Sequence, residues 1–163
     1  MHIKLINKKL IFNKHKVKCA IGKKGIAMNK KEGDGCTPSG IFTFKNLFYR
    51  KDRIKKIKTN LKKVIITKNM GWCDDPESKN YNKLIRFPFL KSAEKLYRKK
   101  NNYDIFLVIN YNLKSTKKNK GSAIFLHIAS RKYDSTEGCI AVSKKDLKYL
   151  LTYIKKNTKI IIA

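Results

Sequence analysis

Short apolar runs and alternations of apolar with polar residues follow one another along this chain. Residues 3–6 and 10–12 flank a polar Asn-Lys-Lys segment, which predicts a first β-hairpin, and residues 16–21 alternate like a half-buried strand. The same patterns predict further strands at residues 41–48, 64–67, 104–111, 123–129, 138–142 and 158–163. Because predicted strands outnumber predicted helices, we expect a mainly β fold.

Two segments have the residue spacing of a helix instead. Residues 143–154 begin with Ser143 as a candidate N-cap and place Asp146 where its carboxylate can return the hydrogen bond. The apolar face of this predicted helix consists of Leu147, Leu150, Leu151 and Ile154. Residues 92–98 predict a second, shorter helix capped by Ser92. The expected architecture is therefore strands with one or two short helices.

Two polar stretches interrupt the predicted strands of the first half. Residues 22–40 are rich in glycine and polar turn residues, which is typical of a loop. Glu32 and Asp34 are candidate calcium ligands, but two acids without further oxygen ligands at regular spacing favour a loop without metal. Residues 49–63 are strongly basic with weak helical periodicity, which suggests a surface excursion. No repeat or linker divides the 163 residues, so we expect one domain over residues 1–163.

Lysine and arginine give the chain a net charge of +29. Such a charge makes nucleic acid or another polyanion a candidate partner, because basic side chains release counterions from phosphate. The lysines are nevertheless spread over every segment beside many isoleucines and asparagines, as codon usage in an AT-rich genome would produce. Two interpretations stay open: a solvated surface with no specific nucleic-acid partner, or a basic polyanion-binding module.

One histidine and one cysteine have the setting of a catalytic pair. His127 lies inside an apolar run, and Cys139 opens the next apolar run directly after Gly138. If the two strands are neighbours, the imidazole can deprotonate the thiol, and Cys139 should then be alkylated well below about pH 8. The backbone N–H groups of Gly138 and Cys139 are candidate donors to an oxyanion. The alternative interpretation is a buried core cysteine and a core histidine with its hydrogen bonds satisfied.

The other three cysteines lack this setting. Cys73 precedes two aspartates whose charge disfavours a thiolate, Cys19 lies in an alternating strand, and no apolar run begins at Cys36. No Cys-x-x-Cys pair is present, so we expect no zinc site. The even number of cysteines permits disulfides without fixing any pairing.

Several motifs together resemble a known family. The string from His127 to Thr136-Glu137-Gly138-Cys139-Ile140 is similar to the signature of the L,D-transpeptidase catalytic domain (YkuD-type), in which an upstream His is followed by Ser/Thr-x-Gly-Cys. Residues 31–40, KEGDGCTPSG, resemble the glycine-rich segment of that family. Residues 71–76, 81–82 and 121–127 match as well, so the resemblance covers most of the chain from about residue 22 to residue 150.

This resemblance implies a β-sandwich that exchanges peptide bonds in peptidoglycan stem peptides or muropeptides. Cys139 would be the nucleophile and His127 the general base and acid of a cysteine-dependent L,D-transpeptidase. No metal or organic cofactor is implied, because the acyl group is carried on sulfur. Transfer to water would make the protein an L,D-carboxypeptidase, and a catalytically idle cell-wall binder is a further possibility.

Four further residues are candidates for binding the substrate. Thr136 and Glu137 precede the nucleophile, while Trp72 and Tyr81 can stack on a sugar or a peptide, although such aromatic residues are more often part of a core. Glu137 stands where the commonest family signature has His, and Ala141 stands where it has Arg. Glu137 has two possible effects: it raises the pKa of Cys139, or it pairs with the protonated imidazole.

The first 18 residues bear on localisation. Charges interrupt every apolar run there, so the sequence predicts neither a signal peptide nor a membrane span. Read alone, this favours the cytoplasm. The family resemblance implies the cell envelope or periplasm instead. The oligomeric state is left open by the sequence.

Overall fold

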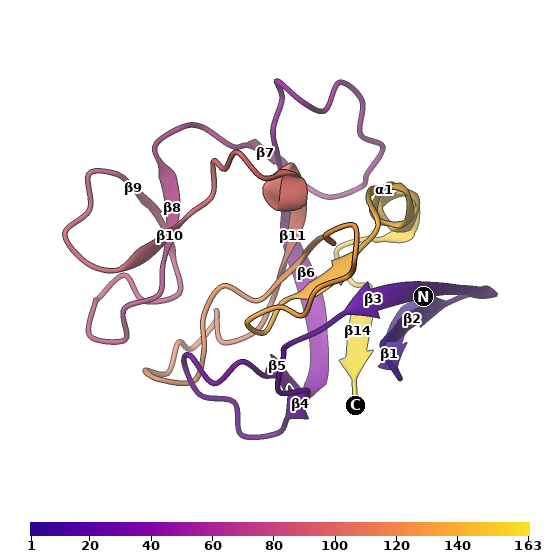
Figure 1. Ribbon diagram of the computed structural model, residues 1–163, viewed down its shortest axis with the longest axis horizontal. Helices are drawn as coiled ribbons and strands as arrows, with labels where there is room; N and C mark the ends of the chain where they lie inside the picture. The colour runs from indigo at the N-terminus through magenta and orange to yellow at the C-terminus, as the bar shows by residue number, and fades with distance from the viewer.

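The computed structural model describes residues 1–163, and most of its regular structure is β-strand (Figure 1). The chain begins with an antiparallel meander of β1 (His2–Ile6), β2 (Lys9–Phe12) and β3 (His15–Ala20). Asn7 and Lys8 join the first two strands and both have positive φ, the conformation that a two-residue hairpin turn requires. The predicted first hairpin is therefore confirmed.

Nine strands form one main sheet. Its order is β11 (Ile105–Ile109), β12 (Phe125–Ile128), β13 (Ile140–Val142), β3, β2, β1, β14 (Lys159–Ile162), β6 (Gly40–Tyr49) and β7 (Lys63–Ile65). The ten-residue β6 pairs with β14 through its first half and with β11 through its second half, so the sheet closes on itself. The expected mainly β class is confirmed, but the layout is a closed sheet rather than two separate sheets of a sandwich.

Two smaller sheets complete the strands. β8 (Met70–Cys73) pairs with β9 (Leu84–Arg86) and β10 (Ala93–Lys95), to the left of the main sheet in Figure 1. β4 (Ile26–Ala27) pairs with β5 (Thr37–Pro38) inside the glycine-rich loop.

The predicted helix at residues 92–98 is wrong. Its centre is β10, in which Glu94 is the antiparallel partner of Trp72 on β8. Cross-strand pairing outweighs the local helical pattern here, as tertiary context commonly does. A short 3₁₀ helix, η1 (Asn101–Tyr103), follows this strand.

The C-terminal helix is confirmed as α1 (Lys144–Tyr153). The Ser143 hydroxyl accepts the Asp146 N–H at 3.0 Å and donates to the Asp146 carboxylate at 2.6 Å, which is the expected cap. Leu147, Leu150 and Leu151 are fully buried. Residues 49–63 contain no helix and form an excursion that places Ile54 in the core.

Two apolar clusters make up the core. The larger one has 24 buried residues, drawn mainly from the main sheet and α1. The smaller one has 10 buried residues and joins the main sheet to β8, with Trp72 edge-on to Phe125 at 5.3 Å between ring centroids. Cys139 packs against this smaller cluster, which therefore supports the functional site.

Candidate active site

Two neighbouring strands bring His127 and Cys139 to one face of the main sheet. The two strands are neighbours, as a catalytic pair would require, and β12 and β13 run parallel, joined by the crossing segment 129–139. His127 pairs in register with Ala141, so Cys139 comes opposite Phe125. From strand spacing and rise, the Cα atoms of Cys139 and His127 are about 8 Å apart, a gap that two side chains on the same face can span.

The Cys139 thiol is held against the start of β12. Its Sγ donates to the Ala123 carbonyl at 3.1 Å and accepts the Phe125 N–H at 3.3 Å. Burial, reinforced by the Glu94 carboxylate, raises the pKa of Cys139 to about 12. Cys139 is therefore a neutral thiol near neutral pH, and any reaction as a nucleophile would require a base.

The His127 imidazole is buried and held in one tautomer. Its Nδ1 lies 2.9 Å from the Ile128 carbonyl oxygen, and because a carbonyl only accepts, Nδ1 carries the proton. Nε2 is then the unprotonated nitrogen. Burial lowers the pKa of His127; the Ile128 carbonyl opposes this and the positive charge of Arg98 adds to it, so that the net pKa is about 4. Tyr103 fixes the ring from one side, edge-on at 5.3 Å between centroids.

The residues before the nucleophile form a hydrogen-bonded turn. Thr136 accepts the Gly138 N–H at 3.1 Å and donates to the Cys139 carbonyl at 2.6 Å, while Thr37 donates to the Gly138 carbonyl at 2.9 Å. The Gly138 N–H, one of the two expected oxyanion donors, is thus already engaged. The Cys139 N–H donates to no protein acceptor.

A cleft of about 1170 Å³ opens over this turn and is lined by Cys139, His127, Ala141, Thr136 and Glu137, among 24 residues. Ala141, in the position where the family signature has Arg, leaves space beside the imidazole with which it pairs in register. Thr136 and Glu137 thus lie where the sequence placed them, beside the nucleophile.

Trp72 and Tyr81 lie outside this lining. Trp72 is 6% exposed and donates its indole N–H to Asn82 at 2.9 Å. The Tyr81 hydroxyl donates to Glu32 and accepts the Gly121 N–H at 3.0 Å. Both aromatic residues therefore hold the structure around the cleft together, which matches the alternative interpretation of them as core.

Glu137 takes neither of the two roles considered for it. Its carboxylate pairs with Lys23 at 2.9 Å on the exposed rim, so it neither pairs with the imidazole nor acts as the acid that raises the pKa of the thiol. The acid whose charge raises the pKa of Cys139 is Glu94, on β10. Glu94 accepts from Arg98 at 2.5 Å and from Tyr103 at 2.6 Å.

Sequence reasoning missed Glu94, Arg98 and Tyr103, all of which line the cleft. Their only signal was the Glu94 and Arg98 spacing of four residues, which the sequence interpretation assigned to a helix. That spacing instead reflects a strand followed by a tight bend, after which the Arg98 guanidinium covers the Tyr103 ring at 4.1 Å.

The four cysteines are free, and no group of three or more His, Cys, Asp or Glu side chains is arranged to hold a metal ion. Burial raises the pKa of Cys19 to about 12, as it does for Cys139, but Cys19 does not line the cleft. None of the helices has the length and apolar character that a membrane crossing requires.

The chain is thus a closed β-sheet in which two adjacent parallel strands, β12 and β13, bring His127 and Cys139 to one cleft. The family model of the L,D-transpeptidase catalytic domain (YkuD) matches residues 4–162, and the chain belongs to this family. Comparisons with curated proteins and with solved structures found no match.

Proposed function

We propose that this protein is a cysteine-dependent L,D-transpeptidase that acts on peptidoglycan stem peptides through a thioester on Cys139. The observation that carries this proposal is the shared cleft, in which an uncharged thiol lies on the same sheet face as an imidazole whose Nδ1 is committed to the Ile128 carbonyl. Family membership supplies the substrate class. The usual location of this family, the cell envelope, is also part of the proposal.

The reaction begins with general-base catalysis. His127 Nε2 takes the thiol proton as Sγ attacks the carbonyl carbon of the third stem residue, a diamino acid linked to D-alanine. The C–S bond forms, and the carbonyl π electrons move to oxygen. The Cys139 N–H, free of protein acceptors, donates to this oxyanion.

Collapse of the tetrahedral intermediate completes acylation. The C–N bond breaks, the protonated imidazole gives its proton to the leaving amine, and D-alanine departs. An acceptor amine from a second stem or from a protein lysine then attacks the thioester, with His127 as base again. The thiol is restored when His127 returns the proton to sulfur.

The second candidate is an L,D-carboxypeptidase, in which water resolves the same thioester. The open rim of the cleft supports this alternative, because water can enter at Glu137, whose side chain is 76% exposed. Incubating the enzyme with a tetrapeptide stem, with and without a second stem, distinguishes the two by mass. Cross-linked product indicates transfer to an amine, and tripeptide alone indicates transfer to water.

Thioester formation with a carbapenem, a β-lactam class that acylates this family, tests the dyad. We expect the wild-type protein to gain the mass of one carbapenem at Cys139, and His127→Ala to remain folded without gaining it. The matched control is His2→Ala, which removes an exposed imidazole and should acylate normally. Intact-mass spectra that show unchanged acylation of His127→Ala would refute the assignment of His127 as the base.

A further inference from the structure

Lys30 is a buried cation in the wall of the cleft. Its side chain is 3% exposed, and its Nζ donates to the Asp34 carboxylate at 2.7 Å and to the Lys31 carbonyl at 3.3 Å. An ammonium group has three hydrogens, so one N–H has no protein acceptor. A buried ammonium with an unused donor is costly unless a ligand or a developing charge uses it.

Two glycines fix where this ammonium lies. A Cβ added to Gly121 would lie 2.8 Å from Lys30 Cε, so the aliphatic part of the lysine runs directly along that glycine. A Cβ added to Gly138 would lie 3.4 Å from Lys30 Nζ. The charged end is therefore against the backbone of the residue that precedes the nucleophile.

Asp34 holds Lys30 in this position. One of its carboxylate oxygens accepts the Lys31 N–H at 2.7 Å, and the other accepts the Cys36 N–H at 2.9 Å. Burial raises the pKa of Asp34, but the hydrogen bonds from Lys30 and from these two backbone groups outweigh it and lower the pKa overall. Asp34, within the glycine-rich motif at residues 31–40, thus fixes the position of the Lys30 ammonium.

We propose that Lys30 is a catalytic residue whose ammonium stabilises the oxyanion formed at the scissile carbonyl. This rests on the proposed acyl transfer at Cys139. The Gly138 N–H is engaged by Thr136, which leaves the Cys139 N–H as one donor where such sites commonly have two. The free N–H of Lys30, beside Gly138, supplies the second donor together with a full positive charge.

The test compares two reactions of the same thiol in the full chain. Acylation by p-nitrophenyl acetate passes through an oxyanion, whereas alkylation by iodoacetamide does not. We expect the ratio of acylation rate to alkylation rate to fall about 100-fold in Lys30→Met, the size of effect seen when one oxyanion donor is removed. The alkylation rate reports separately any change in thiolate content that the loss of the lysine charge causes.

Two further variants protect this test from effects on folding. Lys30→Met/Asp34→Asn removes both charges, so no buried carboxylate is left unpaired, and it should show the same fall. Lys31→Met removes the adjacent exposed lysine and should keep the wild-type ratio. A ratio that is unchanged in both Lys30 variants would overturn the role of Lys30. A higher KM with an unchanged kcat would overturn it as well.

The wild-type protein separates this inference from the proposed function. Acylation of Cys139 by the ester but not by a carbapenem would overturn the substrate class and leave the Lys30 comparison valid. Acylation by neither reagent would overturn both proposals.

Discussion

Cys139 and His127 line the same cleft as two neutral groups rather than as an ion pair. The sequence suggested a thiolate made reactive below about pH 8 by its histidine. Burial works against both charges, however: the pKa of the thiol is raised to about 12 and that of the imidazole is lowered to about 4. In the proposed reaction the proton must then move during attack, so that Cys139 and His127 would act in one step.

This arrangement predicts the pH dependence of the two thiol reactions. The rate of carbapenem acylation should rise as pH increases through about 4, where His127 becomes neutral, and stay level through neutral pH, because both required forms dominate until about pH 12. Alkylation by iodoacetamide, which depends on thiolate, should increase with pH without a plateau below pH 8. The measurement is the mass of the peptide that carries Cys139, at a series of pH values. An alkylation plateau in the acid range would show an ion pair instead.

The candidate active-site residues differ in how clearly the sequence indicated them. Cys139 and His127 stood out because each is an isolated polar group at an apolar run. Lys30 was hidden among 40 basic residues, and only its contacts with Gly121 and Gly138 distinguish it from a surface lysine. The burial of a side chain depends on the assembled fold and cannot be read from the local sequence pattern.

Among the elements, periodicity was a good guide to strands and a poor one to their pairing. The strands at residues 3–6, 104–111 and 123–129 were predicted close to their observed positions. The parallel pairing of β12 with β13 was not predicted. The eleven-residue connection between Ile128 and Ile140 is long enough for a crossover, and the apolar pattern of a strand does not reveal its direction.

The turn into β13 is sensitive to the addition of a single methyl group. Gly138 has φ +142°, and a Cβ there would lie 2.7 Å from the Cys36 carbonyl oxygen, which is backbone and cannot rotate away. Gly138→Ala should lower the free energy of unfolding by about 1–3 kcal/mol from overpacking, in addition to the backbone strain, and should abolish acylation by displacing Cys139.

Gly25→Ala is the matched control for this variant. Gly25 also has positive φ, at +85°, but a Cβ there meets nothing within 4 Å. It should therefore show only the backbone cost, about 1–2 kcal/mol, with normal acylation. Denaturant unfolding and intact mass measure the two effects, and equal losses in both variants would show that contact with Cys36 is unimportant.

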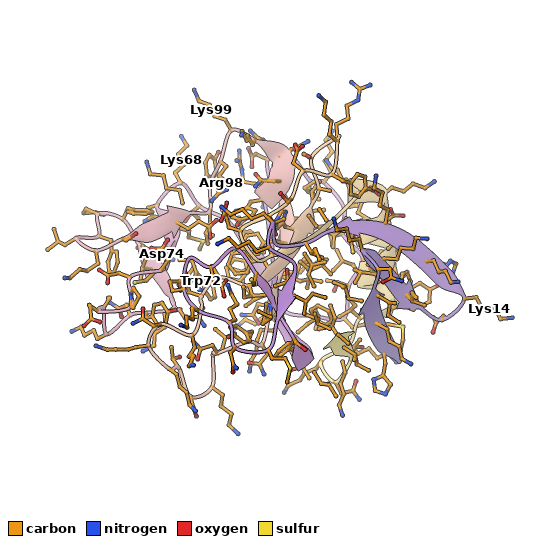
Figure 2. All side chains as sticks on the ribbon, turned by 60° about the horizontal axis from the view of Figure 1, so that its bottom comes forward. Lys14, Lys68, Trp72, Asp74, Arg98 and Lys99 are labelled. Atoms are coloured by element: carbon orange, nitrogen blue, oxygen red, sulfur yellow. The ribbon has the colours of Figure 1, made fainter.

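At the scale of the whole molecule, charge is distributed rather than focused. Six ion pairs use only a small part of the 40 basic residues, and lysines such as Lys14, Lys68 and Lys99 project from different sides of the protein (Figure 2). A dispersed charge raises solubility and non-specific attraction without forming a binding site.

The protein should accordingly bind duplex DNA weakly and without sequence preference. We expect affinity to fall steeply with salt and to vanish by physiological ionic strength, because counterion release is the only driving force. Fluorescence anisotropy with two duplexes of unrelated sequence measures this. Submicromolar binding that prefers one duplex at physiological salt would instead support the polyanion-binding alternative.

The pairing of β1 with β14 has a consequence for the order in which the protein folds. His2 and Ile3 lie beside Lys159 and Ile160 in parallel register, so β1 is synthesised long before the strand with which it pairs (Figure 1). The β1–β2–β3 meander is local and can form early, but one of its edges stays open until β14 has been synthesised. Closing so long a loop is slow, and the exposed edge is meanwhile available to other chains. Lys4, the one charged residue of β1, opposes such pairing until β14 is present.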